Sequence, residues 1–371
     1  MFRIKVFTVI VIATMVLAAC APAATPAPAV VPPTEVPPAA APADTVPAVP
    51  EVAALVTSSG YTVPAAKCAP NCTYKDMVVG FIQTGPEGAW RTANNASFDE
   101  AATQLGIKLK VYDSQGKVEN QISAFHTFNQ DPEVNVILIA AVDTKGFDDV
   151  LKEAAENGKV VILEDRSLDS SAELYYTRIG SDFVLEGQRG GDEMCKLLEG
   201  SDKMNVVEIS GAVGASAGID RGTGFRQTIE KCGITVTASQ TGDWKVAPSK
   251  AVMEAWLKDP VLKDIQGVHA HNIEEALGAI QAIKEAGLVP GKDIKVVAYD
   301  TTKDTFTALI AGELGAAVEC NPLLGPQVYE IALKGLNGDT TVPSYIASQE
   351  GVFTSAQGPE ALQAILDGWK Y

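Results

Sequence analysis

Apolar runs alternate with amphipathic stretches along the chain from Met77 onward. Runs rich in β-branched residues occupy 78–82, 107–113, 134–142, 160–165, 205–210, 234–239, 265–272, 294–300 and 316–320. Between most of them, apolar residues recur at helical spacing, as in 98–106 and 278–288. Continuous apolar strands separated by helices are typical of parallel sheets that helices cover on both faces.

The number of these strand–helix steps bears on the architecture. The steps are more numerous than the strands of one ordinary sheet, and the strand-like segment 173–180 interrupts their alternation. About 300 residues are available, which is enough for two lobes that each have a core. The pattern therefore predicts an α/β fold with two doubly wound, Rossmann-like lobes of parallel sheet. A (β/α)8 barrel is the alternative.

The first twenty residues have the pattern of an export signal. Arg3 and Lys5 precede an apolar run at 6–19 that is too short to span a bilayer as a mature helix. The run ends in Leu17-Ala-Ala-Cys20, which resembles a bacterial lipobox, so we expect lipidation of Cys20. An ordinary signal peptide with a chance cysteine is the alternative. The expected location is extracytoplasmic, anchored to the outer face of the cell membrane, and periplasmic where an outer membrane exists.

Residues 21–66 are rich in proline, alanine, valine and threonine and carry almost no charge. Proline removes backbone donors and favours extended conformations, so this segment is predicted to be a disordered tether. The whole chain of 371 residues has a formal net charge of −17. Such an acidic balance argues against nucleic acid as a partner and against capture of anions by a general field.

The remaining cysteines leave several interpretations open. Cys68 and Cys72 fit a small disulfide loop, since a metal site would need a second ligand pair. Cys195 and Cys232 lie on separate predicted helices and are either buried thiols or a bridge. Cys320 ends a predicted strand, and the sequence has no C-x-x-C redox motif.

Polar residues follow nearly every predicted strand. In open α/β sheets, ligands bind beyond the carboxyl ends of the strands, so these residues are candidates for a binding site. Any one acid or amide there also serves as a helix cap. The candidate ligand-binding residues are Gln83, Glu87, Trp90, Arg91, Asp165, Arg166, Ser216, Asp220, Arg221, Asn272, Asp300, Glu319 and Asn321.

The stretch 209–225 is the most informative part of this set. An apolar strand enters a loop of glycine, alanine and serine, and a helix then opens with Asp220 and Arg221. Carboxylates accept hydrogen bonds, guanidinium groups donate them and amides do both, which suits the paired hydroxyls of a neutral sugar. Trp90 and Trp244 are candidates to cover the apolar face of a sugar ring, and ordinary packing is the alternative for each.

Motifs for catalysis or for cofactors are missing from the sequence. There is no G-x-S-x-G, no P-loop and no H-E-x-x-H, and the glycine-rich loop at 211–218 lacks the dinucleotide-binding spacing. His269 and His271 share one face of a predicted strand, which is a weak metal signal without an evident third ligand. We therefore expect no enzyme activity, no cofactor and no metal.

Several segments together resemble the type 1 periplasmic binding proteins of the ribose-binding class, which are solute receptors of ABC importers. The resemblance covers about 76–355 and is nearest to the members that bind galactofuranose. It rests on VGFIQTGPEGAWR (79–91), ENQISAF (119–125), FDDVLKEA (147–154), LEDRSLD (163–169), VVEISGAVGASAGIDRGTGF (206–225), SKAVMEAW (249–256), AHNIEEALGAIQAIKEAGLVPGKDI (270–294) and AVECNPLLGP (317–326).

The resemblance implies two lobes that close on a monosaccharide, galactofuranose or a related pentose or hexose. Three hinge crossings are implied near Gly180, near Asn321 and within 347–352. The implied domains are 75–180 with 323–350 and 181–322 with 351–371. Family sugar contacts map onto Trp90, Arg91, Asp165, Arg166, Arg221, Asn272 and Asp300.

The resemblance also implies the partners. The expected protein is a monomer that delivers its sugar to an ABC permease in the membrane. A sensor of the same fold that signals to a membrane kinase or chemoreceptor is an alternative, and a carbohydrate-active enzyme is a further one. Departures near Pro86 and at 320–322 leave the sugar and its ring size open.

Overall fold

The computed structural model describes residues 59–64, 66–262 and 264–371. The expected signal with Cys20 lies outside the described residues, as does the expected tether over 21–58 and at 65. The described residues belong to one compact unit. None of the helices within these ranges combines the length and apolar character needed to cross a membrane.

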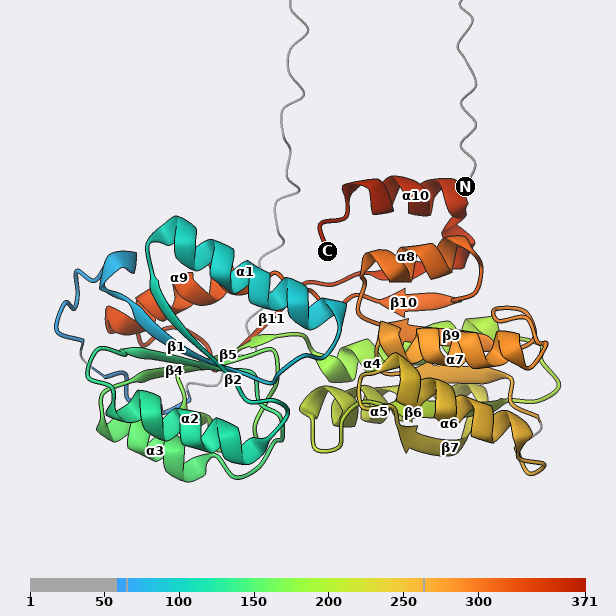
Figure 1. Ribbon diagram of the computed structural model, residues 1–371, viewed down its shortest axis with the longest axis horizontal. Coiled ribbons are helices and arrows are strands. Elements are labelled where there is room, and N and C mark those ends of the chain that lie inside the picture. Colours follow the sequence, from blue (N-terminus) through green and yellow to red (C-terminus); the bar gives the residue numbers. More distant parts are fainter. Residues whose placement is uncertain (1–58, 65, 263) are drawn as a thin grey trace, which may run out of the picture. The chain divides into compact units, whose positions relative to one another are not determined.

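The first sheet has six parallel strands in the order β11-β5-β4-β3-β1-β2. Helices α1 and α9 cover one of its faces and α2 and α3 the other (Figure 1). We call this sheet with its four helices lobe one. Its elements are β1 (Val78–Gln83), α1 (Ala89–Leu105), β2 (Lys108–Asp113), α2 (Val118–Gln130), β3 (Val136–Ile139), α3 (Asp148–Glu156), β4 (Val160–Glu164), β5 (Thr177–Gly180), α9 (Gly325–Leu336) and β11 (Tyr345–Ala347).

The second sheet has six strands in the order β12-β10-β9-β8-β6-β7, and only β12 runs antiparallel to its neighbour. Helices α4 and α5 lie on one face, and α6, α7, α8 and α10 on the other. We call this assembly lobe two. Its elements are α4 (Phe183–Leu197), β6 (Asn205–Ser210), α5 (Ser216–Ile229), β7 (Thr235–Thr241), α6 (Val246–Lys258), β8 (Gly267–Ala270), α7 (Ile273–Glu285), β9 (Lys295–Tyr299), α8 (Lys303–Ile310), β10 (Ala316–Val318), β12 (Val352–Thr354) and α10 (Pro359–Gly368).

Burial follows the position of each strand in its sheet. The central strands β3, β4 and β8 are buried at every residue, because helices cover both of their faces. The edge strands β2 and β7 contain only exposed or half-buried residues and have the more polar sequences KLKVYD and TVTASQT. The two sheets are separate and open, and each ends in two edge strands. This confirms the predicted two-lobed α/β fold and excludes a single closed (β/α)8 barrel.

The chain crosses between the two sheets three times. It leaves the first sheet after β5, returns after β10 to form α9 and β11, and leaves again to form β12. β11 and β12 were not among the predicted apolar runs, because both are short and only half-buried, whereas the equally short β10 is fully buried and was predicted. Three short crossings place the carboxyl ends of both sheets on either side of a shared region, where the candidate residues gather.

Two disulfides are present in the described part of the chain. Cys68 bonds to Cys72 before β1, and Cys195 at the end of α4 bonds to Cys232 after α5. Of the two interpretations left open for Cys195 and Cys232, the structure therefore shows the bridge and not buried thiols. Cys320 is a free, buried thiol.

Candidate functional site

A pocket lies between the two lobes, at the carboxyl ends of both sheets. It is formed largely by charged and aromatic side chains that the chain brings from distant segments. The lining residues are Glu87, Trp90, Arg91, Asp165, Arg166, Phe183, Ala217, Arg221, Trp244, Asn272, Asp300 and Cys320.

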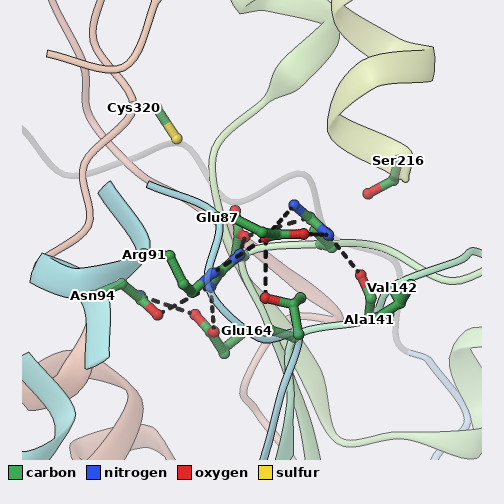
Figure 2. Close-up of polar contacts among 12 residues, drawn as sticks. Glu87, Arg91, Asn94, Ala141, Val142, Glu164, Ser216 and Cys320 are labelled. Carbon is green, nitrogen blue, oxygen red and sulfur yellow. Dashed lines mark hydrogen bonds and ion pairs between the residues drawn. The ribbon is translucent and has the colours of Figure 1, made fainter. Parts of the chain in front are cut away.

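Arg91, in the first turn of α1, organises the lobe-one side of the pocket. Its Nη2 donates to Asp165 Oδ2 at 2.5 Å, and its Nη1 donates to Glu164 Oε1 at 3.2 Å. Asn94, one turn later on α1, contacts both Arg91 and Glu164, as Figure 2 shows. The Arg91 side chain is 2 % exposed, so these carboxylates compensate a charge that is nearly shielded from water.

Arg166 makes a second ion pair on the same side. Its two terminal nitrogens donate to the two carboxylate oxygens of Glu87, at 3.2 and 2.8 Å, which is the fork geometry that guanidinium and carboxylate share. Nη1 also donates to the Ala141 carbonyl. Asp165 and Arg166 thus present adjacent charges that are held in fixed positions.

Arg221 organises the lobe-two side of the pocket, as Arg91 organises the lobe-one side. It lies on α5, and its Nε donates to Glu186 Oε2 at 2.6 Å while Nη2 donates to Asp300 Oδ1 at 3.1 Å. Its Nη1 donates to the His271 carbonyl at 2.6 Å. The helix that follows the glycine-rich loop therefore directs its arginine toward the strand ends of β8 and β9.

Two tryptophans flank these charges. Trp90 lies with its ring centroid 4.7 Å from the Arg91 guanidinium carbon, and its indole N–H donates to the Cys320 carbonyl. Trp244 stacks near Arg166 at 5.5 Å and has a positive φ of 60°. Its buried indole nitrogen has no hydrogen-bond partner in the described structure, which leaves a donor beside the pocket. Flat apolar faces beside paired polar groups suit the two kinds of surface that a sugar ring presents.

The electrostatics of the pocket are dominated by burial and by ion pairing. Burial raises the pKa of Glu164 to about 7, although the Arg91 charge opposes the shift. Burial also raises the pKa of Asp300, and the charge of Arg221 again lowers it in part. Three arginines and three acidic residues line the pocket, so its formal charges balance.

Most of the predicted candidates line this pocket, but some lie elsewhere. Ser216 accepts from the Ser167 N–H at 3.0 Å, outside the lining. Asp220 is on the same helix as Arg221 but is not part of the lining. Glu319 accepts from the Gly351 N–H, and the Asn321 side chain accepts from the Leu323 N–H. Gln83 is buried, and neither polar atom of its amide has a partner in the described residues.

Sequence reasoning did not include every residue that lines the pocket. Phe183 and Ala217 are apolar residues at helix starts and have no distinguishing sequence signal. Trp244 and Cys320 follow predicted strands, and Trp244 was considered as a cover for a sugar ring with packing as the alternative, but neither was among the candidate ligand-binding residues. The predicted candidates also did not include Glu164 and Glu186, the carboxylates that pair with Arg91 and Arg221. For Glu164 a signal exists, because it is an acid at the end of the buried run VVILE.

Two groups in the described residues bring metal-ligating atoms together. They are Glu208 with His269 and His271, and Glu186 with Cys320 and Glu350. Glu208 supplies the third possible metal ligand beside His269 and His271, which the sequence alone did not indicate. However, both Glu208 oxygens already accept from Arg226, and Ser239 donates to one of them. Burial lowers the pKa of His269 to about 3, although the Glu208 carboxylate opposes the shift. The Glu208 carboxylate is thus already engaged by Arg226 and Ser239, and Nδ1 of each histidine has no hydrogen-bond partner in the described residues.

Comparison with known proteins shows the family. A model of the periplasmic binding protein domain matches residues 79–340. The galactofuranose-binding protein YtfQ of Escherichia coli strain K12 is 42% identical over 270 residues, which covers 72% of this chain and 84% of that protein.

Solved structures agree. The binding protein of an arabinose ABC transporter from Shewanella sp. ANA-3, bound to α- and β-L-arabinofuranose, is 38% identical with a TM-score of 0.74 and covers 80% of this chain and 99% of its own. A Mycobacterium smegmatis protein in complex with β-D-fucofuranose is 40% identical with a TM-score of 0.73 and covers 79% and 97%. YtfQ and the Shewanella protein are binding proteins and not enzymes, which argues against the alternative of a carbohydrate-active enzyme. The chain therefore belongs to the periplasmic binding protein family, in its ribose-binding class of sugar-binding proteins.

Proposed function

We propose that this protein captures a neutral monosaccharide in its furanose form, galactofuranose or a close relative, in the pocket between its lobes. The observation that carries the proposal is the balanced set of three arginines and three carboxylates between two tryptophans. Each arginine is held by carboxylates, so the pocket offers fixed donors and acceptors without a net charge to satisfy. A charged ligand would add an uncompensated buried charge, which is costly.

The ring size is proposed from the relatives. The proteins described above are named for, or hold, galactofuranose, arabinofuranose and fucofuranose. Discrimination would come from hydroxyl geometry, since each buried donor or acceptor that a wrong epimer leaves unpaired costs about 1–3 kcal/mol. Under this proposal Glu87, Arg91, Asp165, Arg166, Arg221, Asn272 and Asp300 bind hydroxyls, and Trp90 and Trp244 bind ring faces.

The domains and partners complete the proposal. We take 75–180 with 323–350 as one domain and 181–322 with 351–371 as the other, in line with the pairing of β11 and β12. The two domains close on the sugar and present it to an ABC importer. A lipid on Cys20 and the segment 21–66 would tether the protein, as a monomer, to the outer face of the membrane.

Calorimetry with a sugar panel tests the proposal. The panel contains D-galactose, L-arabinose, D-ribose, D-glucose and myo-inositol, with furanose-locked derivatives and D-galacturonate as the anionic control. We expect a dissociation constant in the micromolar range or tighter, about 8 kcal/mol, for a furanose-forming neutral sugar and no heat with galacturonate. Absence of heat with every neutral sugar would contradict the proposal.

A further inference from the structure

Glu274 contacts both lobes although it does not line the pocket. It is the second residue of α7 in lobe two. Its Oε1 accepts from the backbone N–H of Ala89, the first residue of α1 in lobe one, at 2.8 Å. Its Oε2 accepts from the side-chain amide of Asn272 at 2.9 Å. One carboxylate therefore joins the start of α1 to a side chain of the pocket.

The local backbone is shaped to admit this carboxylate. Gly88, which precedes α1, has a φ of 97°, and a Cβ at that position would lie 2.1 Å from Glu274 Oε1. A residue with a side chain would thus occupy the space that the carboxylate fills. The free N–H groups at the start of α1 need hydrogen-bond acceptors, and Glu274 Oε1 supplies one of them.

The residues attached to each end of this contact line the pocket. Trp90 and Arg91 directly follow Ala89 on α1, and Asn272 caps α7 by accepting from the Glu275 N–H at 2.8 Å. Holding Ala89 and Asn272 together therefore fixes the lobe-one wall relative to the lobe-two wall. Two further lobe-to-lobe hydrogen bonds use only neutral groups: the Ser167 N–H donates to Ser216 Oγ, and the Thr144 N–H donates to the Gly214 carbonyl.

We propose that Glu274 is a latch: a positioning residue that holds the lobes in the closed, sugar-retaining form and orients Asn272 toward the sugar. The proposal rests on the proposed function for its ligand. A carboxylate bond to a backbone N–H exists only when the lobes are together, so its free energy favours the closed form alone. The latch then slows sugar release without contacting the sugar.

Glu274→Ala tests the latch, with Glu285→Ala as the matched control. Glu285 ends the same helix and accepts from Lys250 and Gln281 within lobe two. With L-arabinose and D-galactose as probes in stopped-flow binding, we expect Glu274→Ala to raise the dissociation rate about tenfold or more, with the association rate changed much less. Glu285→Ala should stay within about twofold of the wild type. A Glu274→Ala protein that released both sugars at the wild-type rate would overturn the proposal.

Gly88→Ala supplies an independent variant. Its added methyl group meets the Glu274 carboxylate, so it should also speed release, and less so when Glu274→Ala is already present. Equal effects of Gly88→Ala in both backgrounds would count against the latch, since strain in the glycine backbone alone acts in either background.

Spin labels on Asp149→Cys in lobe one and Lys258→Cys in lobe two report the lobe separation without relying on affinity. The distance distribution of the ligand-free protein should shift to longer values in Glu274→Ala and not in Glu285→Ala. If the wild type bound no sugar of the panel, the proposed function would fail while this distribution still decided the latch. An unchanged distribution would then refute it.

Discussion

Asp165 and Asp300 adopt the same unusual backbone conformation at the ends of strands from different sheets. Their φ angles are 63° and 67°, in the left-handed region that most side chains avoid. Asp165 accepts from Arg91 and Asp300 accepts from Arg221, so each lobe presents one arginine–aspartate pair to the pocket. The strained backbone turns each carboxylate back toward its arginine, and such strain is concentrated where a site needs preorganised groups.

Arg221→Ala should weaken binding of the preferred panel sugar by more than about 2 kcal/mol. The substitution removes a proposed ligand donor and leaves Glu186 and Asp300 without their shared cation. Asp220→Ala is the matched control, because its side chain adjoins Arg221 in sequence but lies outside the pocket lining. Calorimetry of both variants, with circular dichroism to confirm folding, checks this expectation. A loss below about 0.5 kcal/mol for Arg221→Ala would show that the arginine does not contact the sugar.

Gly211→Ala should displace Trp244 from the pocket wall. A Cβ at Gly211 would lie 1.9 Å from the Trp244 ring, so the ring must move. We expect at least a tenfold loss of sugar affinity, together with a change in tryptophan fluorescence, while the far-ultraviolet circular dichroism stays native. Gly218→Ala is the control, since its Cβ would have only ordinary contacts at 3.7 Å or more and alanine favours a helix. Native affinity in Gly211→Ala would exclude Trp244 from the site.

The sequence predicted the fold more completely than the site. The nine apolar runs all contain strands, and for the central strands the reason is that parallel strands buried on both faces need continuous apolar segments. The strand-end rule identified positions such as Arg91, Arg221 and Asp300, but it could not say which strand ends face one another. Glu319 and Asn321 obey the rule and yet bond to nearby backbone. Phe183 and Ala217 reach the pocket only through helix packing, which no local pattern encodes.

The Cys195–Cys232 disulfide should contribute more stability than the Cys68–Cys72 disulfide. The two bridges close segments with sequence separations of 37 and 4. Chain-entropy arguments give about 4 kcal/mol for the longer loop and about 2 kcal/mol for the shorter. Denaturant unfolding of the two double alanine variants, each without one bridge, checks the order. Equal losses would indicate that loop length does not set the contribution here.

Sugar affinity should fall as pH rises through about 7, in part through Glu274. Burial, aided by the charges of Asp300 and Asp304 and opposed by the hydrogen bond from the Ala89 N–H, raises the pKa of Glu274 to about 7. A raised pKa means that the closed form binds this proton more tightly than an open form does. The contribution of Glu274 protonation to the stability of the closed form is therefore complete below the ordinary glutamate pKa and is lost as pH rises past about 7.

Glu274→Gln isolates this effect, because the amide keeps a hydrogen-bond acceptor and does not titrate. The wild type should lose more affinity than Glu274→Gln between pH 5.5 and 8.5. Glu164, whose pKa also lies at about 7, remains in both proteins, so the difference between their pH profiles is the quantity to measure. Parallel profiles would assign the pH dependence to groups other than Glu274.

Glu350→Gln should stabilise the protein at alkaline pH. Glu350 lies in the third crossing, accepts from Ser181 in the first and from the Asn321 N–H in the second, and faces the Glu186 carboxyl. Burial and then the charge of Glu186 raise the pKa of Glu350 well above its ordinary value. Its stabilising contribution is thus present at low pH and is lost as pH rises through the raised pKa.

A glutamine at this position keeps an acceptor for Ser181 and Asn321 and cannot ionise. Thermal unfolding should therefore show a higher Tm for Glu350→Gln than for the wild type at pH 8.5 and a small difference at pH 5. Glu330→Gln, on the exposed face of α9, is the control and should change the Tm little at either pH. A Glu350→Gln protein that was less stable than the wild type at pH 8.5 would mean that the crossing requires the ionised carboxylate. The three crossings would then be joined by its charge and not by a neutral hydrogen-bonded carboxyl.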